Sequence, residues 1–146
     1  MSVGRVDSLE NGEWAATAFS SASVEVGVTF KCSLHDIMPG LKKGASTTTQ
    51  GYTALDYGFC CRPTGIMEVY ELGVWKYTHT TAYTTDSVLE LRLTKDGFVK
   101  YIIDGRLAYT STTAIGTSES VHFAVAFLTE SAYVKDIVQD NVSNIF

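Results

Sequence analysis

Alternation of apolar and polar residues, with a period of two, is the feature of this sequence that most restricts its fold. Three rows show it: Val24, Val26, Val28, Phe30 and Cys32; Leu89, Leu91 and Leu93; and Val121, Phe123, Val125 and Phe127. Because successive side chains of a strand point to opposite faces, each row predicts a strand with one face in a core. The alanines Ala124 and Ala126 between the members of the third row predict a central strand whose second face is also crowded. No segment has an apolar stripe at helical spacing over three turns.

Glycine-containing turns separate the predicted strands of the middle of the chain. Asp104-Gly105 is a preferred two-residue type I′ hairpin turn, and in Lys95-Asp96-Gly97 the glycine can supply the positive φ of a bulged three-residue turn. Glu71-Leu72-Gly73 separates another pair of apolar segments. Three such turns in succession predict a run of antiparallel strands from residue 66 to residue 111.

About ten strands and one short helical turn, at Leu34–Leu41, follow from these patterns. The strands are Glu13–Phe19, Ala22–Ser33, Tyr52–Arg62, Ile66–Tyr70, Val74–Thr78, Leu89–Thr94, Phe98–Ile103, Arg106–Ser111, Val121–Leu128 and Tyr133–Val138. The 146 residues are the size of one domain. Ten antiparallel strands in one unit must form two packed sheets or a barrel, and rows with one buried face favour the sheets. We therefore expect an all-β, jelly-roll-like antiparallel sandwich spanning residues 1–146.

Charge and hydropathy exclude some partners. The net charge is −5, which argues against a nucleic-acid surface, since such a surface needs clustered Lys and Arg. No apolar run reaches the length of about 18 residues that a membrane-spanning helix requires. Residues 1–5 contain no apolar segment of a signal peptide. Asn141-Val142-Ser143 matches the glycosylation pattern, so Asn141 is a glycosylation candidate, and the expected location is extracellular or at the cell surface.

The three cysteines, Cys32, Cys60 and Cys61, are interpreted as small buried apolar residues. Cys60 and Cys61 are adjacent in a predicted strand, so their side chains point to opposite faces. One of them could pair with Cys32 in an oxidising compartment. The histidines His35, His79 and His122 are scattered and no CxxC spacing is present, so no metal site is predicted.

One part of the chain resembles a known fold family. The segments that carry the resemblance are Gly65–Gly73, Tyr83–Asp86, Leu89–Leu93, Gly97–Gly105 and Tyr109–Ser111, with Asn11–Ala16 and Phe19–Ser21 near the start. Together they resemble the core of concanavalin A-like sandwiches, the superfamily of lectins, glucanases, laminin G-like and SPRY-like domains. Asp104 stands where that family more often has Asn, and Thr85-Asp86 where it often has Gly-Asp. The resemblance implies a jelly-roll fold and binding of carbohydrate or protein. The calcium-and-sugar cluster of legume-type lectins has no counterpart in the sequence, so no cofactor is expected.

Candidate catalytic residues are few. The Glu-x-Asp-x-Glu strand of the related glucanases is absent, and Glu68 and Glu71 fall on opposite faces of one predicted strand. Glu68 and Glu90 could meet on one sheet face as the carboxylate pair that a glycoside hydrolase needs. No Gly-x-Ser-x-Gly elbow and no phosphate or dinucleotide fingerprint is present. We therefore predict no catalytic residue and keep a small glycoside hydrolase as an alternative.

Aromatic residues give the best candidate for a ligand site. Trp75, Tyr77 and His79 are spaced two apart, so we expect them to share one strand face. Sugars stack their flat C–H faces on such rings. The predicted ligand-binding set is Trp75, Tyr77, His79, Tyr83, Tyr70 and Glu68. In the alternative interpretation this face is the sandwich core, with Trp75 as its plug; Trp14 is also expected in the core.

The predicted function is therefore a non-catalytic recognition module that binds carbohydrate. Its expected partner is a glycan or a cell-surface protein. The alternative is a structural or assembly domain that joins an exposed face or edge strand to another chain or to a second copy as a homo-oligomer.

Overall fold

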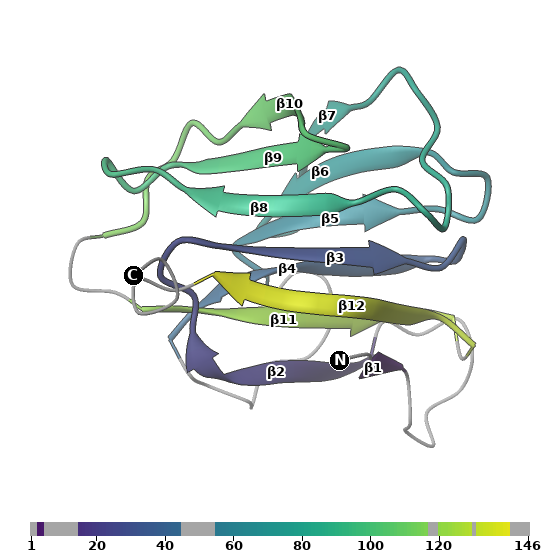
Figure 1. Cartoon of the computed structure of the whole chain (residues 1–146), viewed down its shortest axis with the longest axis horizontal. Helices are drawn as coiled ribbons and strands as arrows, with labels where there is room; N and C mark the ends of the chain where they lie inside the picture. The colour runs from purple at the N-terminus through teal and green to yellow at the C-terminus, as the bar shows by residue number, and fades with distance from the viewer. Residues whose placement is uncertain (1–2, 5–14, 45–54, 117–119, 130, 141–146) are drawn as a thin grey trace.

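Two antiparallel sheets of six strands each stack face to face in the computed structural model (Figure 1). The structure describes residues 3–4, 15–44, 55–116, 120–129 and 131–140, with the backbone alone for 3–4 and 15–22. Sheet A has the order β1 (Val3–Gly4), β12 (Tyr133–Asp140), β3 (Gly27–Cys32), β8 (Leu89–Leu93), β9 (Val99–Ile103), β10 (Arg106–Thr110). Sheet B has the order β2 (Ala15–Ser23), β11 (Val121–Phe127), β4 (Ile37–Lys43), β5 (Tyr57–Cys61), β6 (Met67–Glu71), β7 (Val74–Thr78). The expected all-β sandwich is confirmed.

The ten predicted strands are present, with shifted ends, but two further strands were missed. β1 has only two residues, and β4 replaces the helical turn that was predicted at Leu34–Leu41. That prediction was wrong because β4 lies between β11 and β5 and is buried along Ile37–Leu41, so it has no polar alternation. The described residues contain no helix, and none of them forms a segment that could cross a membrane as a helix.

The core lies between the inner faces of the two sheets. The predicted rows Leu89/Leu91 and Phe123/Val125 are buried there. Phe59 of sheet B meets Tyr101 of sheet A edge to face, with ring centroids 5.1 Å apart, and Phe30 of sheet A lies 6.1 Å from Phe59. Burial of each such side chain contributes about 1.5–3 kcal/mol, so these rows hold the two layers together.

A second buried cluster lies on the outer face of sheet B. It contains Met38, Leu55, Cys60, Ala124 and Ala126, with the partly buried Tyr70 against it. The predicted crowding of both faces of β11 is thereby confirmed, since every residue of β11 is buried. Among β4, β5, β6, β7 and β11, the strands of sheet B whose side chains are fully described, only β7 has exposed residues, and β6 beside it is partly exposed.

All three cysteines are free and buried, as interpreted from the sequence. Cys61 faces the core and Cys60 the outer cluster of sheet B, which confirms their predicted opposite orientation. The Cys61 thiol donates to Met67 Sδ at 3.9 Å. Trp14, Asn141 and residues 11–14 lie outside the described residues, and only the backbone of residues 15–21 is described, so the expectations for their side chains stay predictions.

The edge strands β7 and β10 lie side by side at one edge of the sandwich (Figure 1). Tyr77 of β7 stacks on Tyr109 of β10, with ring centroids 5.5 Å apart and planes 20° apart. The contact joins the two sheets at this edge. Both strands contain a shift of register, between Val69 and Tyr70 in the β6–β7 pair and between Leu107 and Tyr109 in the β9–β10 pair.

Candidate functional site

A bulge in β7 decides which of the predicted site residues share a face. Tyr77 pairs with Val69 and Trp75 pairs with Tyr70, so Lys76 is an extra residue between the two pairs. Val69 and Tyr70 are neighbours in β6 and point to opposite faces. Trp75 therefore lies on the outer face of sheet B and Tyr77 on the inner face. The expectation that Trp75, Tyr77 and His79 share one face was wrong. In a regular strand every second residue faces the same way, but the bulge inserts one extra residue between Trp75 and Tyr77 and so places them on opposite faces.

The exposed end of the outer face, here called the Trp75 face, is formed by Asp36, Arg62, Glu68, Tyr70, Trp75 and Thr78. Trp75 is 52% exposed, so it is not the core plug of the alternative interpretation. Its Nε1 donates to Thr78 Oγ1 at 2.9 Å, and this hydroxyl donates to Glu68 Oε2 at 3.3 Å. The hydrogen bond to Thr78 restrains the indole ring, while about half of Trp75 stays open to solvent.

Charged groups continue the Trp75 face toward β4. Arg62 Nε donates to Glu68 Oε1 at 3.1 Å, and its Nη1 donates to Asp36 Oδ1 at 3.4 Å. Burial opposes the charge on Arg62, but the charges around it and the hydrogen bonds to Glu68 and Asp36 outweigh this effect and raise its pKa. Arg62 thus stays a cation that orients both carboxylates. One guanidinium and two carboxylates give this cluster a net charge of −1.

The other predicted residues lie elsewhere. Tyr77 packs against the core, and its hydroxyl is 3.1 Å from His79 Nδ1. Tyr83 is buried, and its hydroxyl donates to the Ser33 carbonyl at 2.8 Å. Burial raises the pKa of Tyr83. The structure thus brings together Trp75, Tyr70 and Glu68 and separates Tyr77, His79 and Tyr83 from them. The sequence analysis did not identify Arg62, Asp36 or Thr78.

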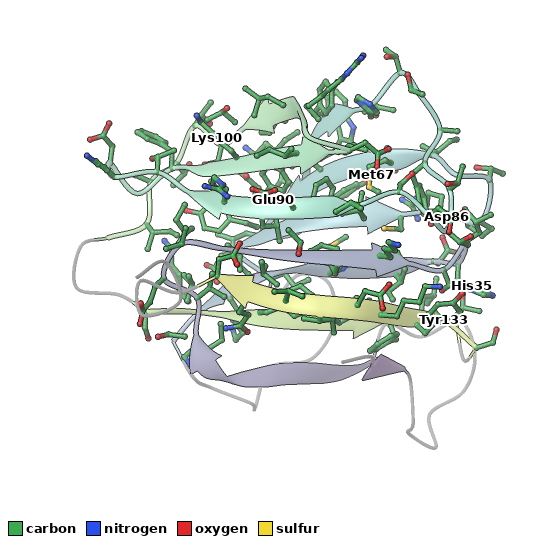
Figure 2. All side chains as sticks on the ribbon, in the orientation of Figure 1. His35, Met67, Asp86, Glu90, Lys100 and Tyr133 are labelled. Atoms are coloured by element: carbon green, nitrogen blue, oxygen red, sulfur yellow. The ribbon has the colours of Figure 1, made fainter. Side chains whose placement is uncertain are left out.

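The suggested carboxylate pair does not form. Glu90 lies on β8 in the front sheet of Figure 2, whereas Glu68 lies on β6 in the sheet behind. Glu90 accepts from Arg92 Nε at 2.7 Å, and Glu68 accepts from Arg62. The expectation that they meet on one face was wrong because the two strands belong to different sheets. Among the described residues, no three His, Cys, Asp or Glu side chains are grouped closely enough to hold a metal ion.

Comparisons with known proteins find similarity in structure but not in sequence. No family model matches the chain, and no curated protein matches it. Among solved structures, the carbohydrate recognition domain of Emp46p in its potassium-bound form has a TM-score of 0.56 and 11% identity, over 81% of this chain and 73% of that one. The carbohydrate-binding module CBM66 of Bacillus subtilis has a TM-score of 0.57 and 13% identity, over 88% and 83%. The TRIM65 PSpry domain has a TM-score of 0.61 and 12% identity, over 85% and 71%.

These similarities confirm the resemblance to the concanavalin A-like fold. At such low identity they show the fold alone. Two of the three structures are described as carbohydrate-binding and the third as a PSpry domain. A sialidase also matches, with a TM-score of 0.55, but only 14% of its chain takes part. The class that the fold defines is thus a two-sheet antiparallel sandwich of the kind seen in these carbohydrate-binding and PSpry structures.

Proposed function

We propose that the chain is a non-catalytic recognition module that binds carbohydrate on the Trp75 face. The observation that carries the proposal is the half-exposed Trp75 ring, fixed through Thr78 beside an ion pair of Glu68 and Arg62. A held indole offers a flat apolar platform to the C–H face of a sugar ring at low entropic cost. Carboxylate lone pairs and guanidinium N–H groups beside it can bind the hydroxyls.

The charged groups of the Trp75 face indicate which sugars it would bind. The Arg62 cation is already paired with Glu68 and Asp36, and the cluster has a net charge of −1. An acidic sugar would meet repulsion without gaining an unpaired guanidinium. The proposed ligand is therefore a neutral glycan. Two of the structural neighbours, a carbohydrate recognition domain and a carbohydrate-binding module, support carbohydrate binding at the level of fold. Glycans displayed outside the cell or at its surface are the proposed partners, and that location follows from the proposed ligand.

A glycan array, probed with the chain and with Trp75→Ala, tests the proposal. We expect the chain to bind neutral glycans and to bind sialylated or sulfated ones less well. Loss of the stacking platform in Trp75→Ala should weaken binding about tenfold or more, in line with the value of well-formed aromatic contacts. Repeating the array with EDTA tests the expectation that no metal takes part.

Leu107→Ala is the matched control for the array. Leu107 is a large apolar residue of β10, 57% exposed, and lies outside the Trp75 face. Its replacement should leave binding unchanged. Equal binding by the chain and by Trp75→Ala would refute the proposed site, and the absence of any binding to the array would refute glycan recognition itself.

A further inference from the structure

A pocket of about 210 Å³ opens at one end of the sandwich, away from the Trp75 face. It lies where β4 and β6 end and where β5 and β7 begin, and its lining includes Asp56, Tyr57, Glu71, Leu72, Val74 and Lys76. Thr113, which follows β10, closes one side, where its carbonyl accepts from Tyr57 Oη at 2.9 Å. We call this hollow the end pocket. Its volume is below the range of about 300–1,000 Å³ typical of drug-sized ligands, so it suits a smaller molecule.

A buried carboxylate with one available oxygen lies in the end pocket. Glu71 is only 6% exposed, and its Oε2 accepts from Tyr101 Oη at 2.9 Å. Within the described part of the chain, no hydrogen bond reaches its Oε1. Burial raises the pKa of Glu71, while the Tyr101 hydrogen bond and the charge of Lys76 lower it. Oε1 is not a fully buried atom, so it is open to a partner in the pocket, and a ligand hydroxyl can donate to it in exchange for water.

The bulge in β7 brings a cation to the same pocket. Lys76 is the extra residue of the bulge, so it does not follow Trp75 and Thr78 onto the outer face. It lines the end pocket and acts electrostatically on Glu71. Over the described ranges, no carboxylate oxygen lies within ion-pair distance of its Nζ. The ammonium is therefore available as a donor to a ligand.

A carboxylate oxygen and an ammonium on one pocket match the two sides of a hydroxyl group. A hydroxyl donates one hydrogen bond and accepts others, so it can donate to Glu71 and accept from Lys76. The charges around the pocket cancel, since Lys43 and Lys76 face Asp56 and Glu71. Neither an anion nor a cation is therefore favoured over a neutral ligand. The exposed side chains of Leu72 and Val74 provide an apolar rim for C–H groups.

We propose that the end pocket is a second binding site, for one neutral polyhydroxylated ring or a short polyol, with Glu71 and Lys76 holding a ligand hydroxyl between them. This site is separate from the Trp75 face. It shares β7 with that face but no side chain, and the argument for it does not depend on Trp75.

Titration of the ¹⁵N-labelled chain, followed by amide chemical shifts, tests the proposal. The probes are D-glucose, D-galactose and glycerol as neutral ligands, with D-glucosamine and D-glucuronate as charged comparisons. A neutral probe should shift the amides of Leu72, Gly73 and Lys76 in a saturable manner. The charged probes should bind more weakly. Glu71→Gln keeps an acceptor for Tyr101 but loses the charge, and we expect about tenfold weaker binding.

Lys76→Met is the second variant and retains most of the aliphatic stem of Lys76. It should also weaken binding about tenfold, because the hydroxyl loses its donor. Trp75→Ala should leave the end-pocket shifts unchanged, which separates this site from the glycan site proposed above. The proposal is overturned if no neutral probe shifts these amides, if a charged probe binds more tightly, or if both pocket variants bind as the unaltered chain does.

Discussion

Cys60 and Cys61 show how a single position decides the environment of a side chain. They are neighbours in β5, yet Cys61 lies among core residues between the sheets and Cys60 lies in the outer cluster of sheet B. Burial raises the pKa of the Cys60 thiol to about 12, and burial also raises that of Cys61 well above its ordinary value. Since the thiolate is the reactive form, both residues are inert packing groups in the folded chain.

Alkaline pH should therefore destabilise the fold. The folded thiols keep their protons up to higher pH than the unfolded ones, which ionise near pH 8.5. The free energy of unfolding should fall as pH rises from about 8.5 toward 12, by up to about 1.4 kcal/mol per pH unit for each such thiol. Urea unfolding at a series of pH values measures this fall. Cys60→Ala should show a shallower fall, and a stability independent of pH over this range would contradict the burial of these groups.

The turn of the β6–β7 hairpin contains Leu72, a residue type that is unfavourable at the positive φ of that position. The turn has two central residues, Leu72 with φ of 52° and Gly73 with φ of 80°, which is the type I′ pattern. Asp104-Gly105 has the same pattern, with φ of 50° and 79°, and was predicted as such. A leucine in the left-handed region costs about 1–2 kcal/mol, whereas asparagine adopts it readily.

Leu72→Asn should therefore stabilise the chain by about 1 kcal/mol. Leu72 is 61% exposed, so its replacement removes little buried surface. Urea unfolding of this variant beside Leu72→Ala separates the two effects, because alanine removes the same side chain but retains the unfavourable φ. If the asparagine variant is no more stable than the alanine variant, backbone strain is not the cause.

β4 shows where the alternation pattern fails as a guide to the fold. The antiparallel strands with one wet face were predicted, because their polar residues mark that face. β4 pairs on both sides and contains Pro39 and Gly40, residues typical of loops. Its pairs with β5 lie at Ile37 before the proline and at Gly40 and Leu41 after it. A Cβ at Gly40 would lie 2.0 Å from the Tyr57 carbonyl oxygen, so close approach of β5 requires glycine there.

The same limits apply to the candidate site. Pairing of the β6–β7 hairpin was enough to predict Tyr70 and Glu68 beside Trp75, because the turn fixes the strand register. Alternation along β5 places Arg62 on the face of Cys60 and could have added it. Asp36 could not be predicted, because it reaches Arg62 only through the missed strand β4. The bulge at Lys76 has no signature in the sequence pattern, so Tyr77 and His79 were placed on the wrong face.

At the scale of the whole molecule, four described strands lie at sheet edges: β1 and β10 in sheet A, and β2 and β7 in sheet B. β7 and β10 lie together at one edge of the sandwich. Val74, Trp75 and Leu107 are large exposed apolar residues of these strands, and such edges can pair with another chain. Both β7 and β10, however, are bulged, and each carries a basic residue, Lys76 or Arg106. Bulges and charges on edge strands oppose edge-to-edge pairing. Assembly of this chain with another through edge-to-edge strand pairing is therefore disfavoured.

Sedimentation velocity over a wide range of concentration should show one species with the mass of the single chain, 15.9 kDa. β7 and β10 are bulged, the pairing of β2 with β11 also shifts register, and β1 has only two residues, so no described edge strand is both long and regular enough to favour pairing with a second copy. A sedimentation coefficient that rises with concentration would contradict this expectation. It would instead favour the homo-oligomer that the assembly alternative implies.

The extra residue in β7 has a consequence for how this surface can change over generations. Val74 and Lys76 face the end pocket while Trp75 faces outward, and this division depends on one inserted position. Loss of the Lys76 codon would restore regular alternation, because Trp75 would still pair with Tyr70 and Tyr77 with Val69. Trp75 would stay on the outer face and Tyr77 on the inner face, but the end pocket would lose its cation. A single deletion in this edge strand can thus alter one recognition surface and leave the other in place.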